Sequence, residues 1–159
     1  MTVQADTEAY IAWVNSLPLA ASFGIKCVEA ARGSTTMTLV ASPIATNPNG
    51  AVHGGVVSAL IDHAMGTTAM TVMTARAAPV TATLNIDYLA PAVPPLTLRT
   101  TVLRHSQALV FMQTHVRSGE RLVDVGTGTF VPRADYLLDP TEATDDLPAY
   151  YFAPRRFGD

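Results

Sequence analysis

The residues of this chain that could do chemistry concentrate in one stretch, a polar loop rich in glycine that leads into a long apolar segment. The loop reads Asn47-Pro-Asn-Gly-Ala-Val-His53-Gly54-Gly55, and the apolar segment ends near Met73. Asp62 is the only carboxylate in that segment. Because Asp is almost never fully buried unless it is paired, a carboxylate in such surroundings is unusual. We therefore predict a functional role for Asp62.

The apolar segment predicts a buried helix. Apart from small residues, only Asp62 and His63 interrupt its hydrophobic character. A helix that is apolar all round is normally buried, so we expect a core helix of about five turns. Residues 52–72 are long enough to span a membrane. However, no Lys or Arg cluster flanks them, and a charged carboxylate inside a bilayer is costly, so we expect no membrane span.

Six stretches have the alternation or the turn spacing typical of strands. Two precede the apolar segment and four follow it: residues 23–31, 34–41, 80–90, 96–105, 108–117 and 121–131. In 80–90, strict alternation would place Leu84 and Ile86 on one face and Thr81 and Thr83 on the other. The short connections between the last three stretches imply antiparallel hairpins. We predict an α+β fold in which a curved antiparallel sheet of about six strands wraps around one long central helix, the hotdog architecture.

The sequence suggests three segments in one compact unit. We expect an N-terminal helix in residues 1–17 with Thr7 as its N-cap, a hotdog domain in 18–132, and a C-terminal extension in 133–159. The extension is acidic and contains three prolines and an aromatic cluster at 150–152. It could dock on the domain or on a neighbouring subunit, or form a partly ordered tail.

Composition excludes several classes of function. The net charge is −3 and the ten Lys and Arg residues are scattered, which argues against nucleic-acid binding. Cys27 is the only cysteine, so no intramolecular disulfide forms, and we expect it to be buried in a strand. The four histidines have no metal-binding spacing, and we predict neither a metal nor a cofactor. No signal peptide is apparent, so we expect a cytoplasmic protein.

Two motifs point to a family. The run from His53 to Gly66, His-Gly-Gly-Val-Val-Ser-Ala-Leu-Ile-Asp-His-Ala-Met-Gly, resembles the HGG-x(6)-D signature of the PaaI-like hotdog thioesterases. Asn85-Ile-Asp-Tyr-Leu-Ala-Pro91 is similar to the Asn-Ile-x-Tyr-x-x-Pro strand that follows the helix in that family. Together with the order of the strands, the resemblance covers residues 18–132.

The resemblance implies roles for individual residues. Asp62 matches the catalytic carboxylate, which acts as a general base or as a nucleophile. Gly54 matches the glycine whose backbone N–H polarises the thioester carbonyl, and Asn47 the residue that orients thioester and water. Thr81 matches the Ser or Thr that assists the water. Further substrate-binding positions are expected at His53, Gly55, Gly66, Thr83 and Arg104. The phosphates of CoA call for cationic groups, and Arg104 and Arg117 are either such groups or ordinary surface charges.

The resemblance also implies an assembly. The family builds its site at a dimer interface, so Asp62 would work with Asn47 and Gly54 of a second copy, and dimers commonly pair into tetramers.

Gly-Gly at a helix start supplies unhindered N–H groups where the helix dipole favours negative charge, as the oxyanion of thioester hydrolysis requires.

Other functions remain open from the sequence. The resemblance implies hydrolysis of an acyl-CoA. Gly66 and Met70 are expected to line the acyl pocket, and the flexible Met favours a medium-chain or an aryl acyl group without deciding between them. The main alternative is a hotdog protein that binds acyl-CoA or another small ligand without turning it over. A hotdog dehydratase would carry a helix Glu in place of Asp62. A purely structural dimerisation module would give no reason for a carboxylate in the core helix.

Overall fold

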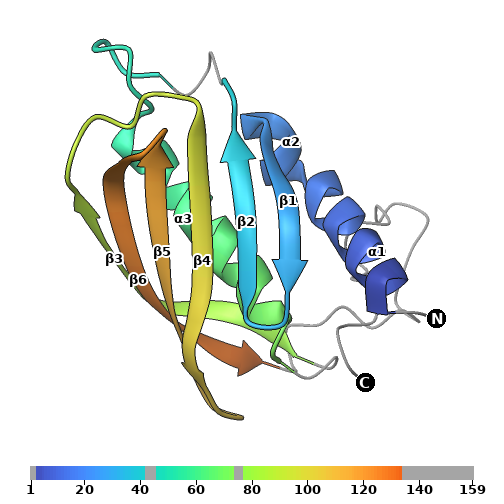
Figure 1. Cartoon of the computed structure of the whole chain (residues 1–159). Helices are drawn as coiled ribbons and strands as arrows, with labels where there is room; N and C mark the ends of the chain where they lie inside the picture. Colours follow the sequence, from blue (N-terminus) through green and yellow to red (C-terminus); the bar gives the residue numbers. More distant parts are fainter. Residues whose placement is uncertain (1–2, 42–45, 74–76, 134–159) are drawn as a thin grey trace.

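A computed structural model describes residues 3–41, 46–73 and 77–133 of this chain (Figure 1). Two helices, α1 (Val3–Ser16) and α2 (Pro18–Phe23), precede the strands β1 (Ile25–Ala31) and β2 (Ser34–Leu39). The long helix α3 (Gly54–Met70) comes next. Four strands follow it: β3 (Ala78–Tyr88), β4 (Leu96–His105), β5 (Val110–Ser118) and β6 (Arg121–Arg133).

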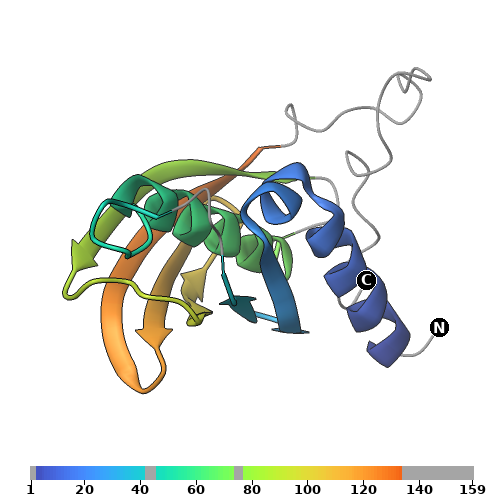
Figure 2. The ribbon, with the colours of Figure 1, turned by 90° about the horizontal axis from the view of Figure 1, so that it is seen from above.

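The strands form one antiparallel sheet that curls around α3. Their order across the sheet is β1-β2-β4-β5-β6-β3, so β1 and β3 are its edges. Seen from above, α3 lies in the hollow of the curved sheet, while α1 lies beside it, next to β1 (Figure 2). This is the hotdog fold, and it confirms the predicted fold class. Gly33 makes the tight β1–β2 turn with a positive φ of 82°, which glycine adopts without steric strain.

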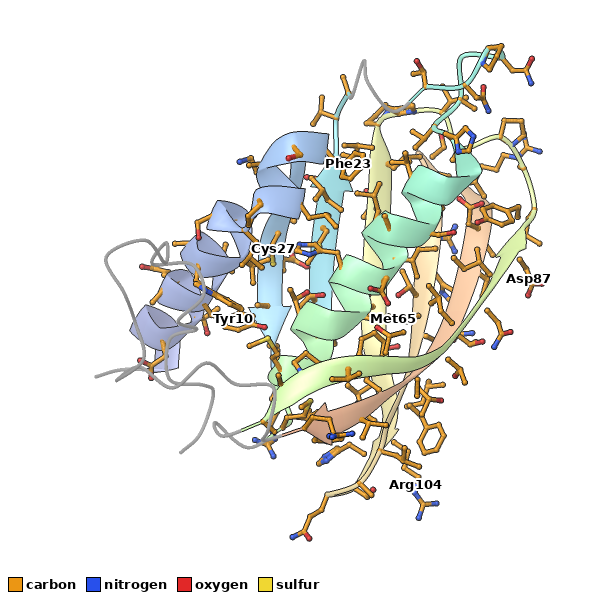
Figure 3. The ribbon with its side chains drawn as sticks, turned by 180° about the vertical axis from the view of Figure 1, so that it is seen from behind. Tyr10, Phe23, Cys27, Met65, Asp87 and Arg104 are labelled. Carbon is orange, nitrogen blue, oxygen red and sulfur yellow. The ribbon has the colours of Figure 1, made fainter. Side chains whose placement is uncertain are left out.

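The core lies between α3 and the concave face of the sheet. One side of α3 buries Val57, Leu60, Ile61, Ala64 and Met65, and Met65 points toward the sheet in Figure 3. Two glycines of β6 allow this close packing. A Cβ atom on Gly126 would lie 2.7 Å from Ile61 Cγ2, and one on Gly128 would lie 2.6 Å from Met65 Sδ.

The N-terminal helices differ in part from the prediction. Helix α1 begins at Val3, so Thr7 lies inside it and is not its N-cap. The sequence analysis missed α2, which Pro18 begins and Gly24 ends with a left-handed φ of 74°. This asymmetry of Pro at the start and Gly after the end is a known helix signal. It shortens the expected first strand, which begins at Ile25.

Helix α1 is tied to the core by side chains. The Tyr10 hydroxyl donates a 2.5 Å hydrogen bond to the carbonyl of Thr67 on α3. Trp13 packs at the edge of the core, with its ring centroid 5.7 Å from that of Tyr10. Cys27 is buried in β1 as predicted, and burial raises the pKa of its thiol to about 11.

The expected C-terminal extension lies outside the described residues, apart from Arg133 at the end of β6. Among the described helices, none is both long and apolar enough to cross a bilayer.

Candidate active site

The loop before α3 is held by Asn47. Its side-chain Oδ1 accepts hydrogen bonds from the N–H groups of Asn49 at 2.9 Å and Ala51 at 3.2 Å. The backbone closes the same turn, because Asn47 N donates to Ala51 O at 2.7 Å. An Asn side chain that bonds its own turn in this way fixes the loop. Within this chain, the side-chain Oδ1 of Asn47 therefore stabilises the loop before α3.

His53 caps the start of α3. Its Nδ1 atom accepts the backbone N–H of Gly55 at 3.0 Å, which satisfies one of the first-turn donors that a helix leaves without an internal partner. The N–H of Gly55 is thus committed to His53. Gly54, the first residue of α3, has no intrahelical acceptor for its own N–H, and the helix dipole makes this end favourable for negative charge.

Tyr88 fixes the first turn of α3 to the end of β3. Its hydroxyl donates to the carbonyl of Gly54 at 3.0 Å and lies 2.7 Å from the hydroxyl of Ser58. The tyrosine ring also lies beside Gly54, where an added Cβ would come within 3.5 Å of it. Tyr88 stood in the strand motif, but sequence reasoning gave neither it nor Ser58 a role.

Asp62 and Thr81 meet as a hydrogen-bonded pair. The Thr81 hydroxyl donates to Asp62 Oδ1 at 2.8 Å, and Asp62 is half-buried on α3. Strict alternation had placed Thr81 on the face opposite Leu84 and Ile86. A register shift between Thr81 and Thr83 in the pairing of β3 with β6 turns Thr81 toward α3 instead. Bulges commonly re-aim a side chain next to an active site.

The expected catalytic residues fall into two separate half-sites within one chain. Asn47 lies in the loop before α3 and Gly54 at the start of the helix, whereas Asp62 lies eight residues beyond Gly54 on α3 and is bonded to Thr81 of β3. At the helical rise per residue, this places Asp62 about 12 Å along the axis from Gly54. A thioester carbonyl bound to the Gly54 N–H would be out of reach of Asp62 in the same copy.

A cleft opens at the first half-site. Its volume is about 370 Å³, and Asn47, Gly54, Tyr88 and Asp124 line it together with apolar side chains. Asp124 of β6 was not singled out in the sequence. Only 1% of its surface is exposed, and its Oδ2 has no hydrogen-bond partner in the described part of the chain. Burial raises the pKa of Asp124 to about 6.

The position of Asp124 could have been read from β6. It shares its parity along the strand with Gly126, Gly128 and Phe130, all buried against the helix side. Alternation alone therefore predicts that this carboxylate points inward.

His63 lies next to Asp62 in sequence and makes no hydrogen bond to it. Burial lowers the pKa of His63, and the neighbouring Asp62 charge opposes that shift. Its Nε2 is buried without a partner among the described residues. His63 is therefore a neutral imidazole near pH 7.

The remaining expected positions are spread over the fold. Gly66 lies one helical turn after Asp62, where an added Cβ would meet the Phe130 ring at 3.6 Å. Thr83 is exposed on β3. Arg104 is exposed near the end of β4, away from α3 (Figure 3). Within the described ranges, no group of three or more His, Cys, Asp or Glu could hold a metal ion.

This chain is similar to known proteins in sequence and in fold. A family model described as the thioesterase superfamily matches residues 49–124. The search of curated proteins finds no match.

Solved structures share the fold. A thioesterase family protein from Silicibacter pomeroyi is 23% identical, with a TM-score of 0.72, covering 78% of this chain and 98% of that one. The Escherichia coli PaaI protein of the phenylacetic acid degradation operon is 19% identical, with a TM-score of 0.68 and coverage of 76% and 88%. A phenylacetic acid degradation-related protein from Ralstonia eutropha is 23% identical, with a TM-score of 0.69 and coverage of 77% and 98%.

Proposed function

Residues 49–124 belong to the thioesterase superfamily, which makes the chain a thioester hydrolase by class, and from that premise we propose that it hydrolyses a medium-chain or aryl acyl-CoA to a free acid and CoA. The observation that carries the proposal is the Asp62–Thr81 hydrogen bond in a domain of this superfamily. A carboxylate on a buried helix, held by a hydroxyl from the neighbouring strand, would suit the role of a general base or nucleophile.

The chemistry needs two further groups. The Gly54 N–H at the start of α3 would stabilise the negative charge that develops on the thioester oxygen. As a general base, Asp62 would take a proton from the attacking water; the C–S bond would then break, and CoA would leave as the thiol with that proton. As a nucleophile, Asp62 would attack the carbonyl and expel CoA as the thiolate, forming a mixed anhydride with the acyl group. Water would then hydrolyse this anhydride to the free acid and restore the Asp62 carboxylate, and the released proton would neutralise the thiolate. Thr81 would orient the carboxylate or the water.

The distance between the half-sites supports a homodimer. Asp62 and Thr81 of one copy would face Asn47 and Gly54 of the other, so that each dimer has two complete sites. The strand β3 lies at an edge of the sheet and pairs only with β6 within the described chain, which leaves its other edge available for pairing. Dimers would then pair into tetramers.

The test is hydrolysis of an acyl-CoA panel by wild type and Asp62→Asn. The panel contains phenylacetyl-, hydroxybenzoyl-, hexanoyl- and palmitoyl-CoA, and CoA release is measured. Because Asn keeps the size of Asp but cannot take a proton, kcat should fall by about 10²- to 10⁴-fold.

The matched control is Asp87→Asn, an exposed carboxylate of β3 that points away from α3 in Figure 3. It should leave kcat unchanged, and both variants should keep the wild-type circular dichroism spectrum. Wild-type protein that binds acyl-CoA but releases no CoA would favour the alternative, a non-catalytic ligand-binding protein. Full activity in Asp62→Asn would remove the catalytic assignment.

A further inference from the structure

One edge of the sheet is bonded to a side chain of α1. Asn15 lies in the last turn of this helix, which runs beside the edge strand β1 (Figure 1). The N–H of Cys27 on β1 donates to Asn15 Oδ1 at 2.7 Å, and Asn15 Nδ2 donates to the carbonyl of Cys27 at 3.0 Å. Both polar backbone groups of Cys27 therefore face α1 and not the neighbouring strand β2.

This pair of bonds reproduces what a further strand would offer. In an antiparallel sheet, the two residues of a hydrogen-bonded pair exchange two N–H···O bonds. The side-chain amide of Asn carries a donor and an acceptor side by side, so it can take the place of such a residue. A strand added at this edge would need the N–H and the carbonyl of Cys27. Asn15 already occupies both.

The buried face of α1 holds Asn15 in this position. Tyr10 and Val14 are 1% and 0% exposed, and the Tyr10 hydroxyl bonds the carbonyl of Thr67 on α3. Residues four apart lie on one face of a helix, so the packing of these two side chains fixes the rotation of α1. Asn15 follows Val14 and is turned about 100° from it, toward β1. Asn is a poor helix former, so the helix itself gives no reason for this residue.

Strand β1 is also irregular beside this contact. Its pairing with β2 shifts between Cys27 and Glu29, so Val28 has no partner on β2 and is 48% exposed. A bulge of this kind bends an edge strand, and bulges and covering helices are two common means of preventing edge pairing. At the other edge, β3 is 11 residues long and pairs only with β6 in the described chain.

We propose that Asn15 blocks the β1 edge against a second copy of this chain, so that the sheet can be extended only from β3. Extension from one edge stops at two copies, because a two-fold contact uses the same surface of both. Extension from both edges has no such limit, since each added copy presents a further open edge. The inference goes beyond the proposed hydrolysis and does not depend on it.

The experiment compares the assembly size of wild type, Asn15→Leu and Asn15→Ser. Leu has the branching of Asn but cannot bond the backbone of Cys27, and Ser is polar but too short to bond both groups. Mass is measured by sedimentation velocity over a wide range of protein concentration. The weight-average mass of both variants should rise with concentration, to roughly twice the wild-type value or more.

A second substitution tests whether the growth uses β1. Val28→Lys places a charge at this edge, where pairing of two copies would bring equal charges together. Combined with Asn15→Leu, it should return the mass to the wild-type value. Gly126→Ala is the control for a simple loss of stability, because it disturbs the packing of α3 on β6, which three strands separate from β1. It should keep the wild-type mass.

The outcomes separate this role from stability and from the reaction. A lower melting temperature of Asn15→Leu and Asn15→Ser without growth in mass would overturn the proposal, because the two bonds would then only satisfy the backbone of Cys27. Growth that persists with Val28→Lys, or that is equal in Gly126→Ala, would also overturn it. Asp62→Asn, which removes the proposed reaction, should have the wild-type mass. Failure of the proposed hydrolysis would therefore leave this result unchanged.

Discussion

At the scale of single residues, Asp62 and Asp124 show how surroundings assign different roles to the same side chain. Asp62 is half-buried and accepts a 2.8 Å hydrogen bond from Thr81. Asp124 is buried in the wall of the cleft at the start of the same helix, and its Oδ2 has no partner among the described residues. A carboxylate that is held and reachable suits proton transfer or attack, whereas an unpaired buried one has a raised pKa because burial disfavours its charged form.

The unpaired state of Asp124 predicts a pH dependence of stability. Burial raises its pKa from 3.8 to about 6, so the folded protein binds this proton more tightly than the unfolded chain does. The contribution of Asp124 to the free energy of unfolding is therefore most favourable below pH 4, falls as the pH rises toward 6, and is constant above. The full change is roughly 2–3 kcal/mol.

The measurement is urea unfolding of wild type and Asp124→Asn at pH 4.5 and pH 8, at one protein concentration. The difference in unfolding free energy between the two proteins should shift in favour of the variant at pH 8. Tyr88, the other titratable side chain of the cleft, is present in both proteins and cancels from the comparison. Parallel pH profiles would show that Asp124 is not desolvated.

At the scale of elements, the helix and the sheet hold the site because β6 lets α3 come close. Gly126 and Gly128 face Ile61 and Met65 at distances that leave no room for a Cβ. The bulge in β3 then directs Thr81 to Asp62. Farther along β3, Tyr88 bonds the first turn of the same helix. One strand thus contacts both half-sites.

This packing predicts that Gly126→Ala is destabilising. The new methyl group would lie 2.7 Å from Ile61 Cγ2, on a branched side chain close to its own backbone, so α3 or β6 must shift. Overpacking of this kind typically costs about 1–3 kcal/mol. Thermal unfolding measures it, with Thr127→Ala as the control, since Thr127 is exposed between the two glycines. Equal melting temperatures for both variants would mean that the helix is not held this closely.

At the scale of the whole molecule, one copy carries every expected catalytic residue but cannot bring them to one substrate. The separation of about 12 Å along α3 is fixed by helix geometry, so loop motion cannot remove it. A symmetric dimer would overcome this separation. Each of its two equivalent contacts would bring the Asp62 half-site of one copy to the Gly54 half-site of the other, which completes two sites. The edge strand β3, which carries Thr81, is the element most directly available for that contact.

Mixed dimers test this arrangement. Asp62→Asn and Gly54→Val each damage a different half-site, so each pure variant should be nearly inactive. After joint unfolding and refolding, half of the dimers are mixed, and each of these has one intact site. Activity should recover to about a quarter of the wild-type value. A site built within one subunit would give no recovery of activity. Wild-type protein that is unfolded and refolded in the same way gives the reference activity.

Local patterns in the sequence determined the central helix, the six strands and the position of Asp62. Hydrophobicity along a helix or strand follows directly from which face is buried, so it can be read without coordinates. The HGG motif likewise lies at the helix start, where the sequence analysis expected it. The tail beyond Arg133 lies outside the described residues, so the expectations for it stay predictions.

Only the tertiary structure decided what depends on neighbours distant in sequence. The bulge that turns Thr81 toward Asp62 arises from the pairing of β3 with β6, which no local pattern records. Whether Asp124 Oδ2 finds a hydrogen-bond partner depends on residues of other elements, and none of the described residues bonds it. The 12 Å between the half-sites could have been derived from sequence spacing and helical rise alone. The structure then places the pairs Asp62–Thr81 and Gly54–Tyr88 at separate points along one helix, which is why a complete site needs a second copy in the proposed dimer.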